Sequence, residues 1–442
     1  MKNFKRGLVL VLFIIAILIY FNYPKLNLIS GFASKNMASS VFIAHRTPES
    51  ITENDNNIPL VKLADVSVGD KSATGSVYGL MERKSIYREG LGCVLINDDF
   101  DQTKAYLKPN RFTSKDTLPF PYGNNGTIDS IFKNVNYEKL TAAIENSFSE
   151  PEIKKTRTVL VSYKNIIIAE KYAEGFDENT PILGWSMTKS IISTLYGILQ
   201  YKDKIDINEP APIASWQNDE RKNITINNLL RMQSGLAWDE DYSSISDVTK
   251  MLFLDTDMTK AQEEKQAVAK PTEIWNYSSG TSNLLSGILR SQFKTDQEYL
   301  DFPYKALIDK IGMNSMLLEA DMAGNYVGSS YAWATTRDWA KFGILYLNKG
   351  NWNGVQLFDE NWVNYITTPT KNSNGTYGGH FWLNADGKYP DVPRDLFSAN
   401  GFQGQRVFII PSKDLVIVRT GLAEEPEFNI NTFLSEIISA ID

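Results

Sequence analysis

The chain has little cysteine and little histidine. Its 442 residues include one cysteine, Cys93, and two histidines, His45 and His380. A single cysteine excludes an intrachain disulfide and a multi-cysteine metal site, and its apolar neighbours predict that Cys93 is a small buried residue. With so few histidines and no His-Glu-x-x-His motif, the sequence offers no zinc-hydrolase signature, so we expect neither a metal nor a cofactor.

Two further absences reduce the number of catalytic sites that the sequence could form. No Gly-x-Ser-x-Gly elbow occurs, and a Ser-His-Asp triad would have to use one of the two histidines. We interpret His380, which lies in Tyr-Gly-Gly-His-Phe-Trp near a predicted strand, as structural. The net charge is −7 and no basic stripe is present, so nucleic acid is not an expected partner.

The first 25 residues form a segment of their own. Three cations precede an uncharged run from Gly7 to Pro24, a pattern typical of a signal peptide or a membrane anchor over 1–25. No small-x-small cleavage site follows, which favours an uncleaved anchor. The cations at the start then predict an exported, membrane-anchored protein with the rest of the chain on the extracytoplasmic side, in a bacterial periplasm or at the cell surface.

Beyond the anchor, residues 26–120 show no clear periodicity and are interpreted as an accessory segment of unknown role. Residues 121–442 carry the signals of a single large domain. Strands are predicted at 158–162, 166–172, 380–384, 405–410 and 415–420, and helices at 137–148 and 429–441. The stretch between the two strand groups is mostly helical. The predicted fold is α+β, with an antiparallel sheet built from both ends of the domain, flanked by helices, and an inserted, mostly helical region.

The most informative stretch is Gly-Trp-Ser-Met-Thr-Lys-Ser, which begins an apolar helical segment. Ser186 lies at the first turn and Lys189 three residues later on the same face. A buried, neutral lysine can activate a serine hydroxyl, and the helix N-terminus favours the negative charge that develops there. The Ser-x-x-Lys spacing recurs at Ser130 and Ser291 without this context. We therefore predict Ser186 as the nucleophile, against the alternative of a capping serine.

Two loops offer further parts of a site. Tyr277 lies on a loop before a predicted helix, where a neighbouring lysine would make it an acid or base; the alternative is a packed aromatic residue. The stretch from Ala399 to Gln405 has two glycines at a strand entrance. The backbone N–H groups of Gln405 and Ser186 are candidates for an oxyanion hole, and a plain turn is the alternative.

Taken in order, Ser186-x-x-Lys189, Tyr277-Ser278-Ser279 and Phe402-Gln403-Gly404 resemble the three motifs of the serine beta-lactamase-related superfamily. This superfamily includes class C beta-lactamases, DD-peptidases, esterases and 6-aminohexanoate-dimer hydrolases. The resemblance covers about 138–442. It implies an acyl-enzyme on the serine, proton transfer shared by the lysine and the tyrosine, and substrate binding by the motif residues Ser279, Phe402, Gln403 and Gly404.

The sequence departs from the family pattern at two positions. Ser279 stands where the family often has asparagine, and Phe402 stands where lysine or histidine is common. The second change removes a cation associated with the beta-lactam carboxylate. The chain is therefore most similar to amide and ester hydrolases of the 6-aminohexanoate-dimer hydrolase type. The alternatives are a DD-carboxypeptidase or beta-lactamase, and a non-catalytic binding protein of the same fold.

An acidic loop follows the Ser-Gly-Leu turn at 234–236. It contains Trp238, Asp239 and Asp241, which we predict to bind substrate, with the carboxylates attracting amine-bearing molecules. The alternative is a solvated acidic loop with aromatic anchors. The expected partner of the protein is a small-molecule or short peptide-like substrate.

Overall fold

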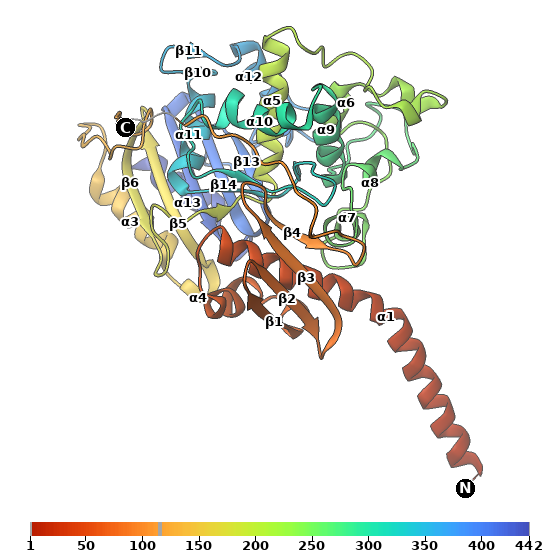
Figure 1. Cartoon of the computed structure of the whole chain (residues 1–442). Coiled ribbons are helices and arrows are strands. Elements are labelled where there is room, and N and C mark those ends of the chain that lie inside the picture. Colours follow the sequence, from red (N-terminus) through yellow and green to blue (C-terminus); the bar gives the residue numbers. More distant parts are fainter. Residues whose placement is uncertain (1, 114–116, 442) are drawn as a thin grey trace. The chain divides into compact units, whose positions relative to one another are not determined.

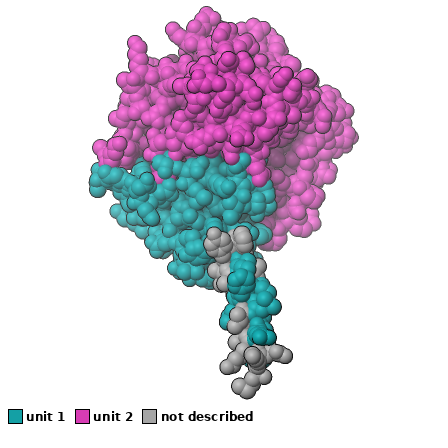
Figure 2. Space-filling view, turned by 90° about the vertical axis from the view of Figure 1, so that its right-hand side faces the viewer, with its two compact units in different colours: residues 1–88, 92–103, 240–256 teal, residues 89–91, 104–239, 257–442 magenta. Residues whose placement is uncertain are grey.

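The computed structural model describes residues 2–113 and 117–441 and divides into two compact units, coloured separately in Figure 2. Unit 1 comprises residues 1–88, 92–103 and 240–256, and unit 2 comprises residues 89–91, 104–239 and 257–442.

Unit 1 consists of one long helix and a four-stranded sheet. The helix α1 (Lys2–Phe42) becomes buried from Leu28 onward, where it packs on the sheet (Figure 1). The strands are antiparallel and follow the order β1 (Ala64–Gly69), β2 (Ser72–Val77), β3 (Leu80–Arg88) and β4 (Gly92–Ile96). A side chain at Gly75 would lie 2.8 Å from the Ser30 carbonyl oxygen, so this glycine permits the close approach of helix and strand.

The interior of unit 1 is small. Cys93 is fully buried there in an apolar cluster with Met37 and Ile51, as the sequence predicts. Two shorter helices also belong to this unit, α2 (Pro48–Ser50) and α7 (Asp247–Phe253).

The prediction of a membrane anchor over 1–25 is wrong. In the described part of the chain, no helix combines the length and the apolarity that a bilayer span requires. The apolar stretch 8–20 supplies only about 20 Å of helix at about 1.5 Å per residue, whereas the hydrocarbon core is about 30 Å thick. Asn22 and Lys25 then follow within α1. The membrane-anchored location that the sequence predicted is wrong for the same reason.

Unit 2 is built around a six-stranded antiparallel sheet. Its strand order is β12 (Trp382–Leu383), β13 (Phe397–Gly401), β14 (Gln405–Ile410), β15 (Leu415–Gly421), β5 (Thr156–Tyr163) and β6 (Ile166–Tyr172). The pairing of Thr420 with Thr158 joins the last strand of the domain to its first hairpin. The prediction of an α+β fold with a sheet made from both ends of the domain is confirmed. The predicted strand 380–384 shortens to two residues, because His380 adopts φ 64° before it.

Helices cover both faces of this sheet. Along β14, Val407 and Ile409 face one cluster and Phe408 and Ile410 face the other, as the period of two requires. The first cluster contains α5 (Met187–Tyr201) and α11 (Thr336–Leu347); the second contains α3 (Tyr137–Phe148) and α13 (Ile430–Ser439).

The inserted region is mostly helical. Further helices of unit 2 are α4 (Pro151–Lys154), α6 (Ile226–Leu230), α8 (Lys260–Glu263), α9 (Ser279–Ser291), α10 (Asp296–Pro303) and α12 (Glu360–Thr367). Short strands are β7 (Ile182–Leu183), β8 (Leu317–Leu318), β9 (Ala332–Ala334), β10 (Asn351–Trp352) and β11 (Val355–Gln356).

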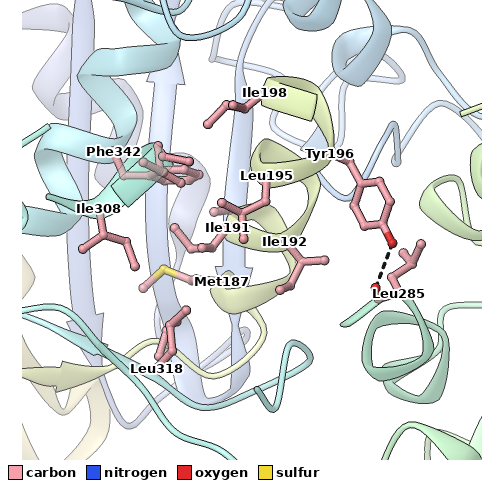
Figure 3. Packing of buried hydrophobic residues seen from close by; sticks show 14 of the residues in the cluster. Met187, Ile191, Ile192, Leu195, Tyr196, Ile198, Leu285, Ile308, Leu318 and Phe342 are labelled. Carbon is pink, nitrogen blue, oxygen red and sulfur yellow. Dashed lines mark hydrogen bonds between the residues drawn. The ribbon is translucent and has the colours of Figure 1, made fainter. Parts of the chain in front are cut away.

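Helix α5 is held on several sides. Figure 3 shows Met187 and Ile191 on the side of Phe342, whereas Tyr196 lies on the opposite side and donates a 2.8 Å hydrogen bond to the Leu285 carbonyl. All residues from Met187 to Leu199 are buried, which makes α5 a central helix rather than a surface one. The residues at its first turn are therefore anchored to the core of the domain.

Candidate active site

Ser186 immediately precedes α5. The turn that leads to it is tight: Trp185 adopts φ 47°, and a side chain on Gly184 would lie 2.4 Å from the ring of Trp339. Ser186 occupies the cap position, yet its hydroxyl makes no cap hydrogen bond to the helix. Ser186 therefore does not act as a capping serine, which was the alternative interpretation. Its hydroxyl is half-buried and is available for another contact.

The Ser186 hydroxyl contacts Lys189. The Lys189 side chain is 2% exposed, and its Nζ donates to Ser186 Oγ at 3.0 Å, to Ser279 Oγ at 2.9 Å and to the Ser329 carbonyl at 2.9 Å. An ammonium group has three N–H donors, so these hydrogen bonds use all of them. At the same 3.0 Å distance between Nζ and Oγ, an uncharged Lys189 amine can instead accept the proton of the Ser186 hydroxyl.

Tyr277 lies beside the same lysine. Lys189 Nζ is 4.9 Å from the centroid of its ring, a cation–π distance. The ring is half-buried and packs against Trp382 and Tyr377, with centroids 5.4 Å and 5.8 Å away. The first two motifs therefore meet, although about ninety residues separate them in the chain.

The loop of the second motif is anchored by Ser278 and by Trp238. Ser278 caps α9, with its Oγ accepting from the Thr281 N–H at 3.0 Å. Trp238 is buried, its carbonyl accepts from the Asn276 side chain at 3.1 Å, and a side chain on Gly280 would lie 2.4 Å from its ring. Trp238 therefore supports the loop that carries the tyrosine.

The two predicted carboxylates of the acidic loop fall in different units. Asp239 is exposed in unit 2, and Asp241 is exposed in unit 1. The Asp241 carboxylate accepts hydrogen bonds from Ser243 and Ser244, which lower its pKa. Their role in substrate binding stays a prediction.

The third motif lies next to the first. A side chain on Gly401 would be 2.0 Å from the Gly184 carbonyl oxygen, so the end of β13 touches the turn before Ser186. The ring of Phe402 meets that of Trp185 edge-on, with centroids 5.6 Å apart. Phe402 and Gln403 are half-buried, whereas Gly404 and Gln405 are buried.

The side chain of Gln405 is fixed to the neighbouring strand. Its Nε2 donates to the Gly421 carbonyl at 2.7 Å, and the Gly421 N–H donates to its Oε1 at 3.2 Å. The side-chain amide is thus committed to the sheet, and only the backbone of this residue is a candidate for contact with substrate.

Sequence reasoning missed two contributors. Ser329 supplies a backbone carbonyl to Lys189, and a carbonyl leaves no side-chain signal in the sequence. The aromatic run from Tyr377 to Trp382 was visible as a pattern, but its contact with Tyr277 was not.

His380 is buried behind the site. Its Nδ1 contacts the Leu230 carbonyl at 2.6 Å and its Nε2 contacts Ser282 Oγ at 3.0 Å. Burial lowers the pKa of His380 to about 3, and the charge of Lys189 acts in the same direction. The neutral ring joins α6 to α9, in agreement with the structural interpretation of this residue.

Comparison with known proteins identifies the family. The sequence model of the Beta-lactamase family matches residues 156–427, well over half of the chain. The chain belongs to the beta-lactamase family. The fold and the superfamily predicted from the motifs are thereby confirmed, and at this coarse level the protein is a hydrolase of the beta-lactamase fold.

Several solved structures share the fold of this protein at low sequence identity. A Bacillus anthracis protein provisionally named a 6-aminohexanoate-dimer hydrolase is 21% identical, with a TM-score of 0.58 over 67% of this chain and 81% of that one. A penicillin-binding protein homologue from Caulobacter crescentus is 12% identical, with a TM-score of 0.56 over 69% of this chain and 98% of that one. A family VIII carboxylesterase is 16% identical, with a TM-score of 0.51 over 69% and 96%. Likeness at this identity concerns the fold.

Proposed function

We propose that this protein is a serine hydrolase that cleaves an amide or ester bond through an acyl-enzyme on Ser186. The observation that supports this most is the 3.0 Å contact between Lys189 Nζ and Ser186 Oγ. It joins a nucleophile to a potential base at the start of a buried helix, where the helix dipole favours negative charge.

The proposed reaction begins when Ser186 Oγ attacks the carbonyl carbon of the substrate. Lys189 takes the hydroxyl proton, and the backbone N–H groups of Ser186 and Gln405 stabilise the tetrahedral oxyanion. Tyr277, which shares the proton with Lys189, protonates the leaving amine or alcohol as the bond to the carbonyl carbon breaks. Water then attacks the acyl-enzyme, gives its proton to the same pair, and Ser186 Oγ recovers a proton as the acid leaves.

The surroundings of Ser186 favour neutral acyl groups. The half-buried Phe402, whose ring meets that of the buried Trp185 edge-on, stands where many members of the superfamily carry a cation. A carboxylate-bearing beta-lactam would lose its charged partner there, whereas a short amide or ester would not. The substrate class that we propose is therefore that of the 6-aminohexanoate-dimer hydrolase and esterase type.

The test is covalent labelling followed by mapping of the modified peptide by mass spectrometry. A fluorophosphonate should label the wild-type protein on Ser186 and should not label S186A. The matched control is S291A, because Ser291 has the same Ser-x-x-Lys spacing but its hydroxyl donates to the Ile288 carbonyl within α9. Folded protein without any label would identify a binding protein. Labelling by penicillin as fast as by the fluorophosphonate would favour a DD-carboxypeptidase or beta-lactamase.

A further inference from the structure

Two arginines lie behind the third motif. Arg406 on β14 and Arg419 on β15 are direct cross-strand partners. Arg406 Nη1 donates to the Gly401 carbonyl at 2.6 Å and to the Gln405 carbonyl at 2.9 Å, so it binds both ends of the turn that contains the motif.

Arg419 is 1% exposed and binds only neutral acceptors. Its Nη1 donates to the carbonyls of Gly404 at 3.1 Å and Ala423 at 2.9 Å. Its Nη2 donates to the Lys154 carbonyl at 2.6 Å, and the guanidinium carbon lies 4.0 Å from the centroid of the Phe428 ring. Among the described residues its hydrogen-bond acceptors are uncharged; burial and the neighbouring charge of Arg406 lower the pKa of Arg419 to about 9, and the Glu424 carboxylate acts in the opposite direction.

The centre of the arrangement is Gly404. It adopts φ 84°, and a side chain there would lie 2.2 Å from the Ala423 carbonyl oxygen and 2.3 Å from Arg419 Nη1. Its N–H donates to Glu424 Oε1 at 3.3 Å, and its carbonyl accepts from Arg419. Both polar groups of this glycine are therefore fixed by side chains of β15 and of the segment that follows it.

One peptide group links Arg419 to the candidate oxyanion hole. The Gly404 carbonyl and the Gln405 N–H belong to the same planar, trans peptide, so they point in opposite directions. Since the carbonyl points at Arg419, the N–H points away from it. A charged donor on the carbonyl also polarises the peptide and strengthens its N–H as a donor.

We propose that Arg419 is a positioning residue of the active site, which orients and polarises the Gly404–Gln405 peptide so that the Gln405 N–H stabilises the oxyanion. Arg406 has a smaller, supporting role, because it holds the ends of the turn and not the peptide itself. This inference rests on the proposed acyl-enzyme mechanism and adds to it a residue that never touches the substrate.

The test compares R419M and R419K with R406M and with R290M as the matched control. Arg290 also binds a backbone carbonyl with its guanidinium, that of Ala323 at 2.9 Å, but it has no contact with the third motif. Each variant is checked for folding by circular dichroism and assayed for kcat and KM with a nitrophenyl ester. Loss of a whole oxyanion donor costs on the order of a hundredfold or more in kcat. We therefore expect R419M to lose roughly tenfold with KM little changed, R406M to lose less, and R290M to keep its kcat.

A second readout separates positioning from loss of stability. Sulfur accepts hydrogen bonds poorly, so an oxyanion hole discriminates between an ester and its thiono analogue. R419M should lower the ratio of ester to thionoester kcat, and R419K, which keeps a charge, should lower it less. An unchanged ratio in folded R419M, or a kcat equal to that of wild type, would overturn the inference. If R419M does not fold, the same ratio measured on R419K decides. Absence of labelling at Ser186 in the wild-type protein would instead overturn the proposed function itself.

Discussion

The two sides of Ser186 are held by different means. On the lysine side, side chains contact one another directly: Lys189 binds the hydroxyls of Ser186 and Ser279 and lies over the ring of Tyr277. On the side of the proposed oxyanion hole, called the oxyanion side below, the backbone makes the contacts: Gly401 lies against the Gly184 carbonyl, and the Gly404 carbonyl accepts a hydrogen bond from Arg419. The lysine side should therefore depend on the identity of its own side chains. The oxyanion side should depend on small residues and on support from the next strand.

The largest effect is expected where the two sides meet. S186A removes the proposed nucleophile and should lower ester hydrolysis by at least about a thousandfold. S130A, at the first of the two other Ser-x-x-Lys sites, should retain the wild-type rate in the same steady-state assay. A label that maps to Ser130 or Ser291 would contradict the assignment.

The next effect tests whether the lysine side acts as one unit. If Lys189 and Tyr277 share a proton path, then K189A, Y277F and the double variant should show similar residual rates, each reduced by about a hundredfold or more. The measurement is kcat/KM for the same ester in a double-mutant cycle. Losses that multiply would show that Tyr277 packs without taking part in proton transfer.

The lysine side should also lose stability in acid through His380. The pKa of His380 is about 3 in the folded protein against 6.5 for the free side chain, so its contribution is complete above pH 6.5 and is lost as the pH falls toward 3. At pH 5 the loss is about 2 kcal/mol. H380N, whose amide can still donate to the Leu230 carbonyl, should remove this pH dependence in urea unfolding. H45N, at the exposed histidine, should retain it.

The urea unfolding experiment compares the pH dependence of stability in H380N with that in the wild-type protein. Asp321 is a buried carboxyl whose pKa burial raises to about 7, so it stabilises the fold as the pH falls and opposes the effect of His380. The difference between H380N and the wild type isolates the histidine. A difference that is constant from pH 7 to pH 5 would contradict the prediction.

A smaller effect is expected from the oxyanion side at Phe402. F402K puts a cation at the first position of the third motif and should raise turnover of carboxylate-bearing beta-lactams about tenfold relative to a neutral ester, the scale of one partly exposed charge pair. F402L keeps the apolar surface and should keep the wild-type preference. Efficient nitrocefin hydrolysis by the wild-type protein, equal to that of its best ester, would refute the proposed substrate class.

The smallest effect concerns the exposed acidic loop. If Asp239 and Asp241 attract substrate, esters with a free amine should be favoured a few-fold over neutral ones, and the preference should shrink as salt rises. The double variant D239N/D241N should show no such preference. A preference that survives both the substitution and high salt would assign it to other residues.

Much of the chemistry is local in the sequence. Ser186 and Lys189 lie one helical turn apart, so their spacing alone predicts that they face the same side. The strands of the central sheet and the helix at 137–148 also follow from periods of two and of 3.6 residues. These features depend only on contiguous residues, and for this reason the order of the amino acids is enough to predict them.

The membrane anchor is the instructive error. Its pattern of cations followed by an apolar run is also local, but the outcome depends on how far the apolar stretch continues within α1. Helix α1 contacts the four-stranded sheet through serine and glycine, at Ser30, Ser34, Gly75 and Ser85, and these residue types carry little hydrophobic signal in the sequence.

Short-range sequence patterns were sufficient to predict the family motifs, the α+β class and the contact between Ser186 and Lys189. They did not reveal that Ser279 reaches Lys189 from α9, that the Ser329 carbonyl completes the hydrogen bonds of this lysine, or that Arg419 lies behind Gly404. Folding alone establishes these contacts, because they join segments that lie far apart along the chain. They depend on strand register and on backbone carbonyls. Every residue has a backbone carbonyl, so the residue type gives no sign of which carbonyl will make a contact.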